Sequence, residues 1–310
     1  MNLVEIQRNA VARGDNMADM IIQNFLEADD FFSRAQFVEF GGSMSYGWNE
    51  EKTLPSAGTR SANADYTENN GETEQRQEAL KIYGGKIGID EAIARQYGPE
   101  VAMRKQEAQI KAIRGKILDD FINGSSATNV EQFDGLKSQL PTTNGSVAGY
   151  REDRGFIVKN ASSAAALSRK QLDNLIANVD TGGTTVLIMD KQVPYFINQY
   201  GESLVTFDKN EFGAPVARYG SIPIITFDRN NLNTKILGFT EASSTSSLFC
   251  VNLDVDKVAM LQGAGGLYSN DPEKSGSKRI YQIDWLLSLA VQGQYNAGRL
   301  YNFTAATMTA

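Results

Sequence analysis

The stretch from Thr53 to Glu78 holds almost nothing that could fill a hydrophobic core. It reads TLPSAGTRSANADYTENNGETEQRQE, and its only larger apolar side chains are Leu54 and Tyr66. A structureless loop of this length is uncommon inside a compact domain. Because the flanking SMSYGW and ALKIYGGKIGID are typical of strands, we predict a long two-stranded projection with a polar tip. An isolated hairpin is marginal in water, so it should lean on something outside its own domain. A disordered linker is the alternative.

The chain contains no histidine, which restricts the chemistry open to it. Ser-His-Asp and Cys-His catalysis, the usual zinc sites and the commonest general base near neutral pH are excluded. Carboxylate, Ser-Lys and cofactor-driven chemistry remain. The only cysteine, Cys250, lies in the strand-like SSLFCVNLD, and we expect it to be a buried structural residue.

Composition indicates a globular protein whose overall charge does not favour anions, although a local basic patch stays possible at this point. With 310 residues and 41% hydrophobic content, the chain can build one large domain or two modest ones. Its net charge of -7 argues against tight binding of nucleic acid or an anionic membrane by the chain as a whole. The first residues show no apolar signal segment, and no apolar run approaches the roughly 20 residues of a membrane span. We expect a soluble protein made in a cytoplasm.

The N-terminal segment is predicted to be an amphipathic helical arm that leads into a strand. NMADMIIQNFLEADDFFSRAQFV spaces its apolar side chains as one helix face would, before the alternating AQFVEF. The side chains at this spacing are Met17, Met20, Ile21, Phe25, Leu26 and Phe32.

A long helix is predicted to have Pro99 in its first turn and to end at the C-cap signal Asn123-Gly124. Its roughly 25 residues would span nearly 40 Å at about 1.5 Å rise per residue. Its apolar stripe is Met103, Ile110, Ile113, Ile117 and Phe121. Such a helix is a strut, and a coiled-coil arm fits less well because Gly115 interrupts the stripe. It runs into an uncharged polar loop that stops at a buried-looking Phe-Asp-Gly-Leu.

From about residue 161 to residue 275, helical and strand-like segments alternate. Ser168 and Gln171 form a capping-box signature, and Gly182-Gly183 follow the helix, whose stripe is Leu172, Leu175, Ile176 and Val179. TTVLIMD and SIPIITFD are predicted strands, and KQVPYFINQY a short helix with Pro194 in its first turn. SLFCVNLD and KVAMLQ read as a hairpin-like pair. A strand-rich segment closes the chain, with Tyr281, Ile283, Trp285, Leu287 and Leu289 in alternation.

Two loop motifs carry weak signals for ligand binding. QGAGGLYSND offers Gly263, Gly265 and Gly266 but lacks the GxxxxGK[ST] pattern of a phosphate-binding loop, so we expect a surface turn. DKNEFG, at residues 208–213, has two oxygen ligands at alternate positions, yet Phe212 stands where a third calcium ligand should be.

Three aspartates are the remaining candidates for chemistry. Asp119, Asp120 and Asp228 could each be half of a carboxylate pair, but solvation at the surface or at a helix end is the default expectation for such residues. We therefore assign no catalytic, cofactor-binding or metal-ligating residue.

The order of these segments carries more information than any single motif. An arm is followed by LP with a long polar hairpin, GIDEAIA, a strut helix ending FINGSS, then FDGL, helix-VLIMD-helix, GSIPIITFD and IDWLLSLAVQGQYNAGRLYNF. This order and spacing, from about residue 17 onward, resembles that of tailed-phage major capsid proteins with the Hong Kong 97-type fold.

The resemblance implies an α+β chain in five parts. These are an N-terminal arm (1–40), an extended hairpin loop (41–85), a peripheral domain with the long helix as its spine (86–160), an α/β axial domain (161–275) and a closing strand that returns to these domains (276–310). The axial domain would gather around hexamer and pentamer axes. Some shells of this fold carry isopeptide cross-links, but Lys52 has no aligned Asn and Glu partners, so no such role is carried over to it.

The resemblance also implies a structural protein and not an enzyme. The chain would self-assemble through hexamers and pentamers into an icosahedral shell that encloses phage double-stranded DNA. Assembly would take place in the host cytoplasm, and the finished shell would be part of the virion. Expected partners are further copies of the chain, a portal, a separate scaffolding protein and, optionally, a decoration protein, without a cofactor, metal or membrane. Acidic charge suits a container that must not grip DNA. An encapsulin nanocompartment shell is the first alternative, and a histidine-free carboxylate hydrolase is the second.

Overall fold

The computed structural model describes residues 2–12, 16–28, 30–68, 70–98, 100–143, 146–201, 204–209, 215–269 and 273–309. Pro99 and residues 210–214 lie outside these ranges, and the side chains of Met17 and Met20 are not described either. The helices are α1 (Leu3–Ala12), α2 (Asn16–Ala28), α3 (Asp30–Arg34), α4 (Glu91–Tyr97), α5 (Glu100–Asn123), α6 (Leu136–Gln139), α7 (Arg169–Asn178) and α8 (Val193–Tyr200). None of these described helices is both long and apolar enough to cross a membrane. The predicted α+β class is confirmed.

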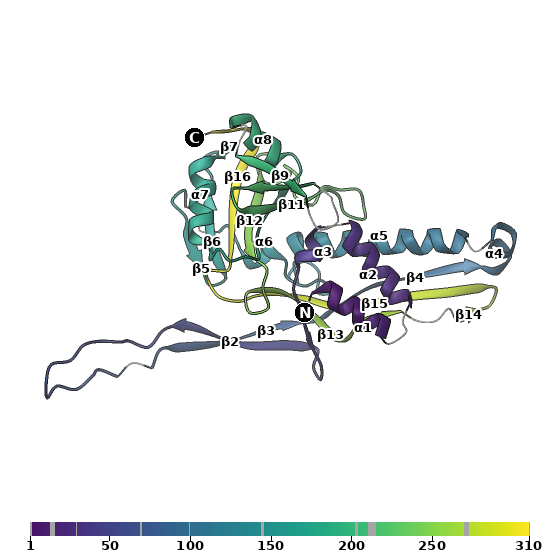
Figure 1. Ribbon diagram of the computed structural model, residues 1–310, viewed down its shortest axis with the longest axis horizontal. Helices are drawn as coiled ribbons and strands as arrows, with labels where there is room; N and C mark the ends of the chain where they lie inside the picture. Colours follow the sequence, from purple (N-terminus) through teal and green to yellow (C-terminus); the bar gives the residue numbers. More distant parts are fainter. Residues whose placement is uncertain are drawn as a thin grey trace.

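A nine-stranded mixed sheet forms one half of the molecule (Figure 1). Its strands are β5 (Tyr150–Glu152), β6 (Gly155–Lys159), β7 (Ala165–Ser168), β8 (Thr185–Asp190), β9 (Val205–Lys209), β10 (Pro215–Tyr219), β11 (Ile222–Phe227), β12 (Ser246–Asn252) and β16 (Ala297–Thr309). Helices α7 and α8 bury Leu172, Leu175 and Ile197 against one face. The central strands β8 and β12 are buried along their whole length because both faces of the sheet are covered.

A five-stranded sheet forms the other half. It contains β1 (Phe37–Phe40), β4 (Lys81–Asp90), β13 (Val258–Ser269), β14 (Glu273–Ser275) and β15 (Lys278–Val291). The alternation predicted for the closing segment is confirmed, because Ile283, Trp285, Leu287 and Leu289 are buried. Tyr281, nearer the exposed end of β15, is only half-buried. One hydrophobic cluster extends from this sheet to Ile188, Phe227 and Phe249 of the nine-stranded sheet, so the two halves share a core.

The N-terminal helices pack into that shared core. Phe25 and Phe37 stack on Trp285, with ring centroids 6.0 and 5.5 Å apart, and Phe31 lies 4.5 Å from Phe121 of α5. The helix and the strand predicted for this segment are both present, and α1 precedes them. Aromatic packing therefore holds α2, α3 and β1 against α5 and β15.

The predicted projection is confirmed as a two-stranded hairpin that extends far from the rest of the molecule (Figure 1). It is formed by β2 (Ser45–Thr53) and β3 (Glu72–Ala79), which pair from Ser45↔Ala79 to Glu51↔Thr73 and, after a shift of register, at Thr53↔Glu72. The returning strand is thus the polar ETEQRQEA, whereas KIYGGKIGID forms β4 of the five-stranded sheet. A ribbon outside the core needs no apolar face, so polarity did not exclude a strand here.

Two predictions for this part of the chain, a strand pairing and a turn, are wrong. SLFCVNLD and KVAMLQ do not form a hairpin, because β12 lies between β8 and β16 while β13 lies between β1 and β15 of the other sheet. Both edges of β12 are occupied, so β13 has no place beside it. The glycine-rich QGAGGLYSND is not a surface turn either. Gly265 and Gly266, at φ +90° and +65°, form an irregularity inside β13 where its register with β15 shifts.

The capping box predicted for α7 is only half present. Ser168 occupies the N-cap position, but its side chain makes no capping hydrogen bond. Its backbone N–H instead donates to Oδ1 of Asn160, at 2.8 Å. The start of α7 was therefore predicted correctly, but the predicted capping bond from the Ser168 side chain is absent.

The long helix α5 comprises 24 residues, or about 36 Å at the standard rise. Ile110, Ile113, Ile117 and Phe121 are buried as predicted, but Met103 is 61% exposed because the first turns of α5 reach beyond α2 (Figure 1). A Cβ at Gly115 would lie 2.8 Å from the backbone N of Asn231. Glycine at this position lets the loop that follows β11 cross the helix.

The Phe-Asp-Gly-Leu segment returns the chain to the end of α5. Phe133 and Leu136 are buried, and the N–H of Gly135 donates to the carbonyl of Gly124, at 3.0 Å. The Asp134 carboxylate accepts hydrogen bonds from the backbone N–H and the hydroxyl of Ser126, both at 2.8 Å. These bonds close the polar loop 124–135 into a compact unit.

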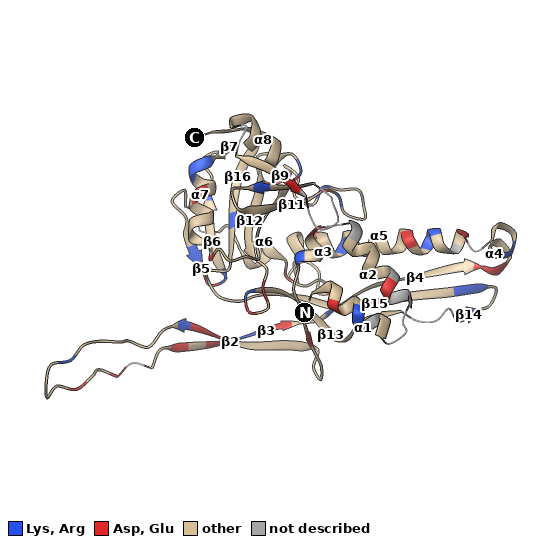
Figure 2. Ribbon diagram, viewed as in Figure 1, with Lys and Arg blue, Asp and Glu red and all other residues tan. Residues whose placement is uncertain are grey.

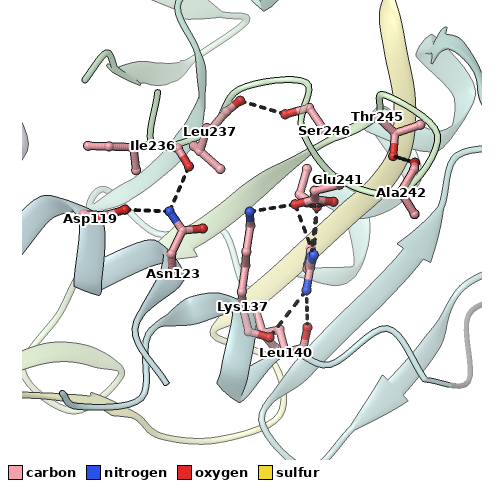
Figure 3. Close-up of polar contacts among 12 residues, drawn as sticks. Asp119, Asn123, Lys137, Leu140, Ile236, Leu237, Glu241, Ala242, Thr245 and Ser246 are labelled. Atoms are coloured by element: carbon pink, nitrogen blue, oxygen red, sulfur yellow. Dashed lines mark hydrogen bonds and ion pairs between the residues drawn. The ribbon is translucent and has the colours of Figure 1, made fainter. Parts of the chain in front are cut away.

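A buried ion network then joins this segment to β16. The Arg299 guanidinium donates to the carbonyl of Leu140 at 3.0 Å and pairs with Glu241 at 3.5 Å, while Lys137 pairs with Glu241 at 2.7 Å (Figure 3). The Arg299 side chain is 8% exposed. Burial alone would raise the pKa of Glu241, but the charges of Lys137 and Arg299 outweigh it and hold that pKa below its ordinary value. Asn123, at the end of α5, donates to the carbonyl of Ile236 on the same loop as Glu241.

Replacing Ile117 with alanine should lower the free energy of unfolding by about 2 to 5 kcal/mol, because Ile117 is fully buried and its loss leaves a cavity. Met103→Ala on the same helix is the matched control and should change it by less than about 0.5 kcal/mol, as surface substitutions do. Chemical denaturation measures both. Unchanged stability of Ile117→Ala would place the stripe on a surface between chains.

Replacing Glu241 with glutamine should destabilise the fold at neutral pH by on the order of 3 kcal/mol, because Arg299 would stay buried beside a neutral partner. The lowered folded pKa means that the stability from ionised Glu241 is present above its ordinary pKa of 4.5 and is lost as pH falls through the folded value. The gap between parent and variant should therefore shrink on acidification. Denaturation curves from pH 7 to pH 3 measure this gap, and a constant gap would show that charge is not its source.

Candidate functional site

The tip of the projecting hairpin makes no contribution to the core of its own chain. Every described residue from Leu54 to Asn70 is exposed, including Leu54 at 74% and Tyr66 at 59%. The contacts of the tip are local: the Arg60 guanidinium lies over the Tyr66 ring, 5.3 Å from its centroid, and donates to the carbonyl of Ala64. The described tip residues are therefore free of the packing that fixes the rest of the chain.

The base of the hairpin, in contrast, is fixed to its own chain by ion pairs. Arg76 of β3 pairs with Asp153 in the turn between β5 and β6, at 3.2 Å, and lies 3.7 Å from Glu50 of β2. Arg154 in the same turn pairs with Glu78 at 2.7 Å. Burial raises the pKa of Glu78, against the opposing effect of Arg154, because the side chain is only 12% exposed. The charges lie where the ribbon leaves the body of the molecule (Figure 2).

Apolar packing supports these ion pairs. Tyr46 and Trp48 of β2 lie against the outer face of the five-stranded sheet, around the buried Leu261 and Ala290. The Tyr46 ring centroid is 5.1 Å from that of Phe40 and 5.8 Å from that of Trp48. Glu50 also accepts a hydrogen bond from the N–H of Gly293 at 2.6 Å. The body of the molecule therefore sets the direction in which the hairpin points.

The aspartates considered as candidates for chemistry have structural partners. Asp120 accepts hydrogen bonds from the Tyr83 hydroxyl and from Lys116, both at 2.7 Å, and burial raises its pKa despite these partners. Asp119 accepts from Asn123 and from Asn230, at 2.8 and 3.0 Å. Asp228 is exposed, with Lys191 and Arg229 each 4.0 Å away. The structure brings none of the three into a shared pair among the contacts of the described residues.

The other candidates do not form a reactive site in the described part of the chain. Cys250 is buried in β12, and burial raises the pKa of its thiol to about 12. Across the described residues, no group of three or more Cys, Asp or Glu side chains is placed to hold a metal ion. Residues 210–213 of the calcium-like DKNEFG motif lie outside those residues. Gly265 and Gly266 belong to a strand, not to the start of a helix that could bind phosphate.

The sequence predicted the hairpin but not the ion pairs that attach its base to the turn between β5 and β6. The alternation of Glu74, Arg76 and Glu78 along β3 was visible as charge on every second residue, which places those side chains on one face of a strand. Their partners Asp153 and Arg154 lie in a short turn much later in the chain, and 76 positions separate Arg154 from Glu78. No local pattern could connect the two segments.

Comparison with known proteins gives structural matches only. No protein-family model and no curated protein matches the sequence. The encapsulin shell in the holo-SrpI complex of Synechococcus elongatus matches with a TM-score of 0.62 at 13% identity, over 89% of this chain and 88% of that one. The capsid of a native GTA particle matches at 0.60 and 12% identity, over 88% and 89%. The capsid of cyanophage A-1(L) matches at 0.60 and 11% identity, over 86% and 90%.

These matches cover between 86 and 89% of the chain. At such low identity the likeness concerns the fold and not the activity. It confirms the resemblance noted from the order of the sequence segments: the chain has the Hong Kong 97-type fold of tailed-phage major capsid proteins.

Proposed function

We propose that this protein is the major capsid protein of a tailed phage, which assembles through hexamers and pentamers into an icosahedral shell around double-stranded DNA. The observation that carries the proposal is the hairpin, whose base is anchored on its own chain and whose described tip residues, from Leu54 to Asn70, are all exposed. Such a ribbon acquires a role only when a neighbour lies beneath it. The fold shared with capsid and encapsulin shells supports the same reading.

In this proposal the parts of the chain have separate roles. Residues 1–40 form the arm, 41–85 the extended loop, 86–160 the peripheral domain, 161–275 the axial domain around the capsomer axis, and 276–310 the closing strand. Assembly takes place in the host cytoplasm with a portal and a separate scaffolding protein, and the finished shell, with or without a decoration protein, is part of the virion. The net charge of -7 supports a wall that encloses DNA without gripping it.

An encapsulin nanocompartment shell is the second candidate, because an encapsulin shell is among the structures with a similar fold. The two candidates differ in the genes expected beside the gene for the shell protein. A phage capsid gene is expected beside genes for a portal and a terminase, whereas an encapsulin gene is expected beside that of a cargo enzyme. A neighbouring cargo enzyme and absent portal genes would favour the encapsulin.

The expressed protein should form closed shells or rings of capsomers, visible by negative-stain electron microscopy and as fast-sedimenting material. The physical reason is that many weak lateral contacts act together once several chains are joined. A monodisperse monomer, at all protein concentrations and salt conditions tried, would contradict both shell proposals.

Removing the tip alone should abolish shells without unfolding the chain. We would replace residues 54–71 with Asn-Gly, which favours the tight turn of a two-residue hairpin, between the paired residues Thr53 and Glu72. This deletion keeps Arg76, Glu78 and the packing of Trp48, so the melting temperature should stay within a few degrees of the parent. Sedimentation should show free chains or small rings.

The matched control keeps the length of the tip and changes its sequence to Gly and Ser. Loss of shells in both variants would show that side chains of the tip make the contact. Loss of shells in the deletion alone would show that assembly requires the length of the tip and not its side chains. Normal shells from the deleted chain would contradict the role of the hairpin in assembly.

A further inference from the structure

Two asparagine-glycine pairs lie within the described residues, Asn70-Gly71 and Asn123-Gly124, and a third pair, at residues 144–145, lies outside them. An asparagine that precedes glycine can lose its side-chain amide without an enzyme, because glycine has no side chain to shield its backbone nitrogen from the asparagine Cγ. The reaction requires that the asparagine side chain and the backbone around it be free to turn. The two described pairs differ in this respect.

Asn70 lies at the end of the exposed tip of the hairpin, close to the start of β3. Its side chain is exposed, and no hydrogen bond joins its amide to another described residue. The described residues from 54 to 71 belong to no helix or strand. Rotation of the Asn70 side chain toward the next backbone nitrogen therefore disrupts no packing of the core.

Asn123, in contrast, is held by the fold. Its amide nitrogen donates to the carboxylate of Asp119 at 2.8 Å and to the carbonyl of Ile236 at 2.9 Å. Asn123 is the last residue of α5, and the N–H of the buried Gly124 donates to the carbonyl of Asp120 at 2.9 Å. The Asn123 side chain can reach the Gly124 nitrogen only after this end of the helix opens.

The shape of the hairpin requires glycine at position 71. Gly71 has φ +68°, and a Cβ there would lie 2.5 Å from the carbonyl oxygen of Thr53. Thr53 pairs with Glu72, and its hydroxyl accepts a hydrogen bond from the Glu72 N–H at 3.0 Å. The close approach that ends the ribbon thus places a glycine directly after Asn70.

We propose that Asn70 is a modification site, at which the side chain converts without an enzyme to aspartate and isoaspartate, while the fold protects Asn123. In this reaction the backbone nitrogen of Gly71 loses its proton to water or hydroxide and attacks Cγ of Asn70. A carbon–nitrogen bond forms, the bond from Cγ to the side-chain nitrogen breaks, and ammonia leaves. Water then opens the resulting succinimide ring at either carbonyl, which gives aspartate or isoaspartate.

The product changes the hairpin in two ways. Residues 45–79 carry seven acidic and three basic side chains, and conversion adds one further negative charge at neutral pH. Isoaspartate also places an additional carbon in the backbone between residues 70 and 71, beside the Thr53–Glu72 pair at which the tip leaves the ribbon. This inference goes beyond the shell function and does not depend on it.

Incubation of the purified full-length chain at mildly alkaline pH tests the proposal. Ion exchange should separate a more acidic form that grows with time, and peptide mapping by mass spectrometry should place the change at Asn70. Conversion at Asn70 should be faster than at Asn123 by about tenfold or more, a ratio that an opening free energy of only about 1.4 kcal/mol produces. In denaturant the two sites should convert at similar rates, because the protection of Asn123 comes from the fold.

Asn70→Gln is the matched variant, since its longer side chain would have to close a larger ring, which forms more slowly. The acidic form assigned to residue 70 should disappear in this variant, and melting curves check that it is folded. Equal conversion of Asn70 and Asn123 in the folded parent would overturn the inference. It would also be overturned by an Asn70 that stays intact while Asn123 converts in denaturant, or by an acidic form that grows as fast in Asn70→Gln as in the parent.

Discussion

The ladder between β4 and β15 is the interaction on which the rest of the molecule depends. It runs without interruption from Lys278↔Asp90 to Leu287↔Lys81. On one side β4 connects the hairpin to α5, and on the other β15 continues toward β16 of the second sheet. Because Tyr83 and Trp285 are paired in this ladder and both face the core, its register also sets the packing of α5 and the N-terminal helices. A slip of β4 by one residue would turn the Tyr83 side chain away from the core.

The sequence predicted elements better than it predicted their partners. Hydrophobic spacing located α5 to within a residue at its end, because Asn123-Gly124 is a strong local signal, and the alternation in β15 revealed its buried face. The pairing of β12 with β13 was wrong because two apolar strands separated by a short link fit a hairpin equally well as a crossing between sheets. Met103 was assigned to the core because periodicity cannot show where the covering elements end.

The same holds for the candidate site, where the local sequence predicts the hairpin but not its contacts with segments far away in the chain. The polar stretch after Thr53 identified the projecting hairpin, since no compact domain could bury it. Its anchoring by Asp153 and Arg154 depends on a contact between segments that are far apart in the chain, and no pattern in either segment reveals it. The uneven distribution of charge is hidden for another reason, because the net charge of -7 is a sum over the whole chain and does not show that the hairpin is acidic while residues 81–116 are basic.

The late position of β15 has a consequence for the order of events during synthesis. Residues 81–123, with β4 and α5, leave the ribosome long before residues 278–291, which complete their sheet. Pairing at such large sequence separation is slow, since the loop must be closed before the contact forms. Until then, β4 lacks the strand with which it pairs, and the buried face of α5 lacks part of the core in which it lies. In the proposed shell, only a nearly full-length chain would be competent to join its neighbours, so unfinished chains would be kept out of a growing lattice.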